Sequence, residues 1–397
     1  MAFGRTHSVG IDIGTDQVKV IVAELPEKSH SPRILGAGIA NMRGMRHGYI
    51  TNPNEAGKSI RAAVEQASKN AGIPIKKAFV SVGGIGLGAI IATGLVNTTK
   101  ADSEITDLDV RRAIEESEKE LPHAYIQNRK IIQTVPLEYR IDGKKVLGKP
   151  QGLRGVRLEV RVLYITCQAH HLSDILGALE HADVEAIDII ASPIASSIVS
   201  LNKTQKIAGC ILANIGAQTT SIIVFEENTP KSLEVFPFGS NDVTNDIALG
   251  LKVGLEDAEQ IKIGNDRGIA YSKKKLDEIV IARLSDIFDL IDDHLRRMDR
   301  SRMLPAGIVL TGGGSGLADI EELARMALHL PSSRARLPLE GNLKAISKDY
   351  EWSVAYGLAV LGLGNDDGST LGGFMFDGGV VKKFFKRFWS WLKKFLP

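Results

Sequence analysis

Two segments of the chain each place an acidic or amide residue, a glycine and hydroxyl residues between apolar runs. The first is residues 10–24 (GIDIGTDQVKVIVAE), and the second is residues 212–226 (LANIGAQTTSIIVFE). Alternating apolar residues around a glycine-containing turn predict a β-hairpin in each segment. Glycine lets the main chain approach a ligand closely and take a positive φ, and successive N–H groups in such a turn bind phosphate. The sequence therefore predicts two phosphate-binding turns that arose by internal duplication.

Side chains in these turns add further phosphate and metal chemistry. The hydroxyl groups of Thr15, Thr219 and Thr220 can donate to phosphate oxygens. Asp12 carries the negative charge that holds Mg²⁺ through water, because this ion keeps most of its hydration shell. One segment alone is compatible with an ordinary structural hairpin, whereas the pair favours two halves of the chain that face each other across a nucleotide.

Length and composition place these segments in a multidomain globular chain. With 397 residues, 44% apolar and 24% charged, the sequence predicts two or three domains. Cys167 and Cys210 lie in apolar surroundings and are expected to be buried core thiols in a reducing compartment rather than zinc ligands. The first apolar stretch, residues 18–25, is flanked by charges and predicts a strand rather than a secretion signal. No uninterrupted apolar run is long enough to span a bilayer.

The end of the chain combines aromatic and basic side chains after a glycine-rich segment. Residues 364–379 predict a flexible linker, and residues 380–397 (VVKKFFKRFWSWLKKFLP) predict a helix with one aromatic face and one basic face. This pattern is typical of a helix that lies in a membrane interface, where each basic residue contributes about 1 kcal/mol on anionic lipid. A helix that docks on the core or on a calmodulin-like partner is the alternative. The residues expected at the membrane are Lys382, Lys383, Phe384, Phe385, Lys386, Arg387, Phe388, Trp389, Trp391, Leu392, Lys393, Lys394, Phe395 and Leu396.

Charge is unevenly distributed along the chain. The formal net charge is +2, yet the basic tail leaves the rest with a small excess of acidic residues. A mildly acidic body with a basic tail argues against nucleic-acid binding and indicates that the tail has its own acidic partner.

Several motifs together resemble the actin and Hsp70 ATPase superfamily. Asp12-x-Gly14-Thr15, with Lys19 following, resembles its first phosphate loop, and residues 214–220 resemble its second. Residues 311–315 (TGGGS) follow an apolar run and resemble the adenosine motif, while residues 258–262 (AEQIK) resemble the helix that reaches ribose and adenine. Residues 353–359 resemble the second connecting helix. The resemblance implies ATP and Mg²⁺ as cofactors, with Asp12 at the metal. It implies phosphate contacts from Asp12, Gly14, Thr15, Lys19, Gly216, Ala217, Gln218 and Thr219, and adenosine contacts from Glu259, Lys262, Gly312, Gly313, Gly314 and Ser315.

Within this superfamily the chain resembles the bacterial cell-division family FtsA along most of its length. The matching stretches are residues 104–110, 135–143, 153–159, 193–197 and 244–251. The resemblance implies an α/β fold of duplicated actin-like (ribonuclease H-like) lobes around a nucleotide cleft, with an inserted 1C-type α+β subdomain and a C-terminal amphipathic helix. The expected organisation is residues 1–82, 162–197 and 350–363 in lobe 1 (1A), 83–161 in the 1C-type insert, 198–245 and 303–349 in lobe 2 (2A), 246–302 in a shortened 2B, 364–379 in the linker and 380–397 in the membrane helix.

Local patterns predict individual elements as well. In the insert, Thr106 is expected to cap a helix over residues 107–120, and strands are expected around residues 131–135, 137–141 and 156–162. Further along the chain, helices are expected from about Asp277 to Arg297 and from about Leu317 to Leu328.

The chain departs from the superfamily pattern in its second phosphate loop. Asn214 replaces the usual acidic residue and cannot supply the charge that helps to hold Mg²⁺ or orient water, and Gln218 adds a side chain where glycine is usual. Ser192 stands where related proteins often carry a polar or acidic residue near the water molecule that attacks ATP. We therefore expect ATP binding with weak or absent hydrolysis. The resemblance implies the C-terminal peptide of the tubulin-like division protein FtsZ as a partner. The family is expected to bind this peptide through the 2B region, which is short in this chain.

The resulting expectation is a nucleotide-binding protein that polymerises with itself and anchors FtsZ to the cytoplasmic face of the cell membrane at the division site. A PilM-type pilus-assembly scaffold and a small-molecule kinase of the same fold are the alternatives. Three other patterns are not expected to be functional sites. They are the incomplete phosphate motif at residues 57–59, the dinucleotide-like glycines at residues 84–89, and His170, His171 and His181, which are expected to be surface or capping residues.

Overall fold

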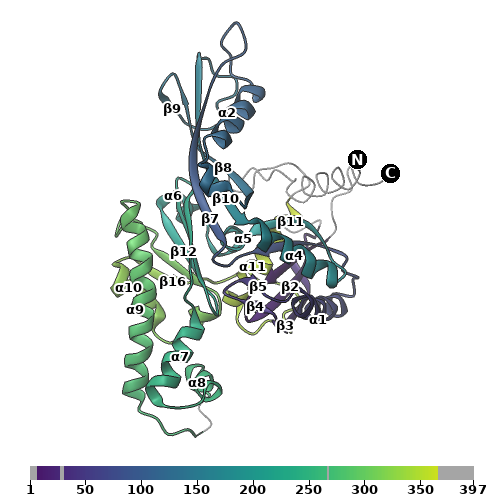
Figure 1. The fold of residues 1–397 in the computed structure, drawn as a ribbon, viewed down its shortest axis with the longest axis vertical. Helices are drawn as coiled ribbons and strands as arrows, with labels where there is room; N and C mark the ends of the chain where they lie inside the picture. The colour runs from purple at the N-terminus through teal and green to yellow at the C-terminus, as the bar shows by residue number, and fades with distance from the viewer. Residues whose placement is uncertain (1–6, 27–30, 266–267, 365–397) are drawn as a thin grey trace.

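The computed structural model describes residues 7–26, 31–265 and 268–364, and its main feature is a pair of five-stranded sheets with one topology (Figure 1). In each sheet the central hairpin is antiparallel, and its first strand also pairs in parallel with a later strand. The duplication predicted from the two hairpins is therefore confirmed at the level of topology. The first sheet has the order β11 (Glu185–Ala191), β6 (Lys77–Val82), β1 (His7–Ile13), β2 (Gln17–Glu24) and β3 (Arg33–Asn41). The second has the order β16 (Ser332–Arg334), β15 (Ile308–Thr311), β12 (Cys210–Ile215), β13 (Thr220–Glu226) and β14 (Thr229–Phe236).

Helices cover both sheets, and we call each sheet with its helices a lobe. In α1 (Pro53–Ala71) the Asn52 side chain accepts from the Glu55 amide, proline stands in the first turn, and the helix ends at left-handed Gly72. Lobe 1 also contains α4 (Ala169–His181), α5 (Ser192–Ser200), α11 (Ser353–Leu363) and the small hairpin β4 (Met45–Arg46) and β5 (Tyr49–Ile50). Lobe 2 contains α6 (Lys203–Ala208), α7 (Ser240–Leu251), α8 (Leu255–Lys262), α9 (Lys273–Arg297), α10 (Ile320–Leu328) and the short turns η1 (Gly313–Gly316) and η2 (Asp349–Trp352).

Two predicted helices of lobe 2 begin at different residues in the structure. The helix expected from about Asp277 begins at Lys273, because Ser272 caps it by accepting from the amide of Lys275. The helix expected from about Leu317 begins only at Ile320, because the preceding glycines form the η1 turn.

An inserted subdomain of residues 87–168 projects from the two lobes as an arm (Figure 1). Its sheet has the order β7 (Leu87–Asn97), β10 (Arg157–Gln168), β8 (Arg129–Ile141) and β9 (Lys144–Val146), with α2 (Asp107–Lys119) and α3 (His123–Ile126) beside it. The predicted cap of α2 is confirmed, since Thr106 and Asp109 form a reciprocal capping box. The two strands expected around residues 131–135 and 137–141 are one strand, β8, which passes Pro136 through a bulge.

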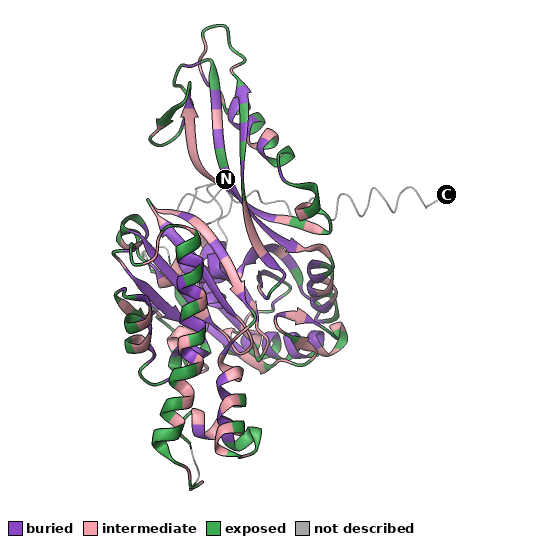
Figure 2. Ribbon diagram, turned by 60° about the vertical axis from the view of Figure 1, so that its left-hand side comes forward, coloured by how far each residue is buried: buried purple, intermediate pink, exposed green. Residues whose placement is uncertain are grey.

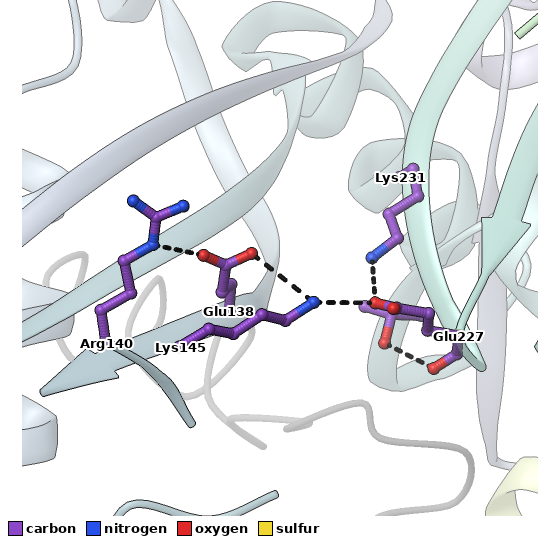
Figure 3. Close-up of polar contacts among 6 residues, drawn as sticks. Glu138, Arg140, Lys145, Glu227 and Lys231 are labelled. Atoms are coloured by element: carbon purple, nitrogen blue, oxygen red, sulfur yellow. Dashed lines mark hydrogen bonds and ion pairs between the residues drawn. The ribbon is translucent and has the colours of Figure 1, made fainter. Parts of the chain in front are cut away.

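The arm contacts lobe 2 through an ion-pair network (Figure 3). Glu138 on β8 binds Arg140 at 2.5 Å and Lys145 at 3.9 Å. Lys145 on β9 also reaches across to Glu227 of lobe 2 at 3.4 Å, and Glu227 binds Lys231 at 3.5 Å. Arg140 holds the pKa of Glu138 below its usual value, and Lys231 and Lys145 do the same for Glu227. The arm is inserted in lobe 1 yet is linked electrostatically to lobe 2.

Buried residues lie mainly in the sheets (Figure 2). One continuous core joins Leu163 and Ile165 at the base of the arm to Ile223 and Phe225 on the sheet of lobe 2. Both cysteines lie in this core, and burial raises the pKa of the Cys167 and Cys210 thiols to about 12. The prediction of buried core thiols is confirmed. No helix within the described ranges is long and apolar enough to cross a membrane.

The two lobes meet beside the crossing of α5 and α11, the helices through which the chain passes from lobe 1 to lobe 2 and back. At this crossing a Cβ on Gly357 would lie 1.9 Å from the carbonyl oxygen of Ala195, so only glycine allows the two main chains to approach so closely. Hydrogen bonds extend the junction, because Ser196 donates to Ser353 and Thr311 of lobe 2 donates to the same hydroxyl, both at 2.9 Å.

Candidate nucleotide-binding cleft

The two predicted phosphate turns have the same main-chain geometry. The amide of Gly14 donates to the carbonyl of Gln17 at 3.1 Å, and the amide of Gly216 donates to the carbonyl of Thr219 at 2.8 Å. A Cβ on Gly14 or Gly216 would lie 2.8 or 3.0 Å from the same carbonyl oxygen. The prediction that these glycines take a positive φ is wrong, since neither is left-handed. Glycine is favoured instead because a side chain at either position would crowd the carbonyl oxygen within the same turn.

Asp12 and Lys19 form the charged part of the first turn. They are cross-strand partners on β1 and β2, and the equivalent partners on β12 and β13 are the neutral Asn214 and Ser221. The hydroxyl of Ser81 donates to Asp12 Oδ1 at 2.9 Å. Burial raises the pKa of Asp12, while Lys19 and Ser81 act in the opposite direction. At these equivalent positions lobe 1 therefore supplies an ionisable carboxyl group and lobe 2 supplies the neutral amide of Asn214.

The predicted adenosine loop follows β15 directly. Gly312 has a φ of +84°, and a Cβ there would lie 2.2 Å from Asn214 Oδ1. Glycine is therefore required at 312 both by conformation and by contact with the second phosphate turn. The Ser315 hydroxyl is buried and donates to the carbonyl of Gly312 at 2.7 Å, so its role is to shape the loop.

The predicted pair on α8 is tied to the start of α7. Lys262 Nζ lies 2.7 Å from Glu259 Oε2 and donates to Thr244 Oγ1 at 2.8 Å and to the carbonyl of Ser240 at 3.2 Å. Thr244 in turn donates to Glu259 at 2.6 Å. The Lys262 side chain is only 6% exposed. Its ammonium group therefore joins the two helices and fixes the position of Glu259 at the cleft.

These elements enclose one cavity of about 870 Å³ between the lobes, within the roughly 300–1,000 Å³ of small-molecule sites. Most predicted residues line it, but Gln218, Ser315 and Thr220 do not. The expectation that Thr220 donates to phosphate is wrong, because its buried hydroxyl donates to the carbonyl of Phe238 at 2.9 Å. The polar start of α7 was not predicted from the sequence, although its hydroxyl and amide residues at a helix N-terminus were a readable signal. The predicted residues that line the cavity are Asp12, Gly14, Thr15, Lys19, Gly216, Ala217, Thr219, Glu259, Lys262, Gly312, Gly313 and Gly314, and those missed include Ser240, Asn241, Thr244 and Asn245.

Gln218 does not line the cavity and instead bonds to His47 of lobe 1. Its side-chain Oε1 accepts from the amide of His47 at 2.7 Å, and its carbonyl lies 3.2 Å from His47 Nδ1. The contact joins residues 171 positions apart, so no local pattern in the sequence could have indicated it.

The patterns rejected from the sequence lie mostly where expected. Residues 57–59 are inside α1, and the glycines at 84–88 lead into strand β7 rather than a helix, although Gly84 itself lines the cavity. The expectation of a surface or capping role is wrong for His171, which is fully buried and bonds the carbonyl of Gly83 through Nε2 at 3.2 Å. Burial lowers the pKa of His171 to about 4, so it is neutral. Among the described residues no three His, Cys, Asp or Glu side chains group as metal ligands.

The linker from residue 365 onward and the expected membrane residues Lys382, Lys383, Phe384, Phe385, Lys386, Arg387, Phe388, Trp389, Trp391, Leu392, Lys393, Lys394, Phe395 and Leu396 lie outside the described residues.

Solved structures identify the fold as actin-like. The structure of a PilM-PilN type IV pilus biogenesis complex matches with a TM-score of 0.66 at 17% identity over 90% of this chain and 99% of that chain. MreB5 of Spiroplasma citri bound to ADP matches with a TM-score of 0.51 at 11% identity over 90% and 96%. At these identities the likeness concerns the fold alone.

Sequence comparisons identify the family. The model "Cell division protein FtsA" matches residues 211–357, and the model "SHS2 domain inserted in FTSA" matches residues 89–166, within the arm. Cell division protein FtsA of Bacillus subtilis is 32% identical over 342 residues, which cover 81% of this chain and 76% of the relative. FtsA of Pseudomonas aeruginosa is 30% identical over 379 residues, covering 89% of each. The chain belongs to the FtsA family of cell-division proteins, as its sequence predicted.

Proposed function

We propose that this protein binds ATP with Mg²⁺ in the cleft between its lobes and anchors FtsZ to the membrane during cell division. The observation that carries the proposal is the pair of phosphate turns, with the same hydrogen bond in each, that line one cavity in a member of the FtsA family. Two such turns on facing lobes offer main-chain N–H groups to a polyphosphate from both sides.

The residues of the cleft fit a magnesium nucleotide. The glycine turns leave room for phosphate, and the Gly312 loop and Glu259, which line the same cavity, would receive the adenosine group. The desolvated carboxylate of Asp12 would hold Mg²⁺ through water, and the ion would neutralise charge on the phosphates. MreB5, a protein of this fold, was solved with ADP bound, which supports a nucleotide here.

Hydrolysis is proposed to be slow or absent. Asn214 is neutral where an acidic residue would help to orient the attacking water, and the nearby Ser192 is also uncharged. Bound ATP would then act as a structural ligand that holds the lobes together, which suits a scaffold better than a kinase.

The tail and the body are proposed to act together at the membrane. The aromatic and basic residues of 380–397 would bind anionic lipid on the cytoplasmic face at the division site. Self-assembly of the body into filaments would join many such tails, so that weak single contacts add to firm attachment. The body is proposed to bind the C-terminal peptide of FtsZ and so to hold FtsZ at the membrane.

The test mixes the full chain with Mg-ATP, FtsZ and vesicles that contain phosphatidylglycerol, followed by sedimentation. We expect the chain to sediment with these vesicles, to bring FtsZ down, and to remain in solution with neutral phosphatidylcholine vesicles. A chain that ends at Gly379 and a full chain carrying Phe388→Ser and Trp391→Ser are the controls, and neither should sediment. FtsZ without its C-terminal peptide should also stay in solution.

The outcomes separate the parts of the proposal. If the chain sediments while FtsZ does not, the tether stands and the FtsZ partnership is refuted. If the full chain ignores anionic vesicles at every lipid concentration, the membrane role is refuted.

A further inference from the structure

The turn between β4 and β5 lies against the first phosphate turn. His47 and Gly48 have φ angles of +47° and +82°, as expected for a two-residue hairpin turn. The amide of Gly48 donates to Thr15 Oγ1 at 3.1 Å. A Cβ on Gly48 would lie 2.1 Å from the Cα of Gly84, so the turn packs tightly against Gly84, a residue of lobe 1 that lines the cavity. Its position is thus fixed by lobe 1.

The same turn is bound by the second phosphate turn through two atoms of one residue. Gln218 accepts from the His47 amide with its side chain at 2.7 Å, and its main-chain carbonyl lies 3.2 Å from His47 Nδ1, which donates when it carries the proton. A glycine at 218 would keep the carbonyl contact and lose the side-chain contact. The side chain that departs from the superfamily pattern is therefore the one that makes the shorter bond between the lobes.

The hydrogen bonds between His47 and Gln218 lie beside the phosphate turns of the cavity. Gly48, Thr15 and Ala217, which flank the His47–Gln218 contact along the chain or in space, all line the cavity at its phosphate turns. The lobes are also joined beside the crossing of α5 and α11, where Thr311 of lobe 2 donates to Ser353 of lobe 1. The lobes can separate at the phosphate turns only if the bonds between His47 and Gln218 break.

We propose that His47 and Gln218 form a clasp that closes the phosphate end of the cleft and slows the release of bound nucleotide. The clasp rests on the nucleotide binding proposed above and adds to it the residues that control exchange. Two hydrogen bonds of ordinary net strength correspond to a slowing on the order of ten- to a hundredfold. The protein would consequently hold a nucleoside triphosphate for long periods without a hydrolytic cycle.

The test measures the dissociation rate of a fluorescent ATP analogue with Mg²⁺ from the full chain, chased with excess ATP. Gln218→Met removes the acceptor at nearly constant size, and His47→Gly keeps the left-handed turn and its amide while removing the ring. We expect dissociation to be roughly five- to tenfold faster for each variant. The double variant loses both bonds and should release nucleotide faster than either single variant, by on the order of ten- to a hundredfold. Arg46→Ala, an exposed neighbour in the same hairpin, is the control and should change the rate less than twofold.

Hydrogen exchange at the His47 amide gives a second measurement that does not depend on nucleotide. This amide should be protected in the unaltered chain and exchange at least fivefold faster in Gln218→Met, with thermal unfolding unchanged. Unchanged dissociation and exchange in Gln218→Met would overturn the clasp while nucleotide binding stands. Absence of nucleotide binding by the unaltered chain would overturn the proposed function and the clasp together.

Discussion

At the scale of single residues, the cleft depends on one desolvated carboxylate. Asp12 has lost most of its hydration, and it is stabilised in return by Ser81 and by the charge of Lys19. The equivalent position in lobe 2 is occupied by Asn214, which is uncharged. The duplicated site is therefore electrostatically asymmetric, and the cost of burying a charge is concentrated in lobe 1.

We predict that Asp12→Asn stabilises the nucleotide-free protein at neutral pH and weakens nucleotide binding in Mg²⁺ about tenfold or more. Burial raises the pKa of Asp12 in the folded state, so stability is lost as the pH rises from the ordinary carboxyl pKa to the raised one, and asparagine removes this cost. The measurements are thermal unfolding against pH and ATP titration with and without Mg²⁺. The stability gain should shrink as the pH falls, and a gain that is independent of pH would contradict this assignment.

At the scale of elements, the site is made by turns that only glycine can form. Gly312 is the clearest case, because its left-handed φ and its contact with Asn214 join the adenosine loop to the second phosphate turn. Its neighbour Gly313 has open space where a Cβ would stand and is not left-handed. Gly312 and Gly313 thus differ in whether another residue could replace them.

We predict that Gly312→Ala lowers the free energy of unfolding by about 1–3 kcal/mol and weakens ATP binding, because the turn is strained and Asn214 is displaced. Gly313→Ala should stay within about 0.5 kcal/mol of the unaltered protein. Urea unfolding of both variants and an ATP titration check this. Equal losses from the two substitutions would show that the loop responds to any side chain.

The sequence predicted the elements that have local signals. The two hairpins, the glycine loop and the cap of α2 each depend on a few neighbouring residues, and all lie as expected. Contacts between distant segments have no such signal. The His47–Gln218 link and the burial of His171 under Tyr49 and Gly83 depend on how the sheets face each other. The bulge at Pro136 was mistaken for a break between strands because proline cannot donate to a sheet.

At the scale of the whole molecule, the arm is inserted in lobe 1 but contacts both lobes. It arises from lobe 1, packs at its base on lobe 2 and is linked to lobe 2 by Lys145 and Glu227 (Figure 3). Any change in the angle between the lobes would therefore be transmitted to the arm.

We predict that Lys145→Glu destabilises the protein by about 0.5–1 kcal/mol at low salt, since it places a third negative charge beside Glu138 and Glu227. The loss should disappear in 1 M salt, where the Debye length is about 3 Å. Lys144→Glu is the matched control, because Lys144 is an exposed neighbour on β9 outside these ion pairs. Urea unfolding at both salt concentrations measures the free energy of unfolding. A loss of stability that persists in high salt would refute the network.

The proposed function depends above all on a nucleoside triphosphate in the cavity between the two phosphate turns, and calorimetric titration of the full chain with ATP in Mg²⁺ measures this binding. We predict one ATP per chain and binding at least tenfold weaker for AMP, because under the proposal both turns would contact the β- and γ-phosphates, which AMP lacks. Binding should also weaken when Mg²⁺ is chelated. Folded protein that takes up no ATP, or that binds AMP as tightly as ATP, would contradict the assignment of this cleft.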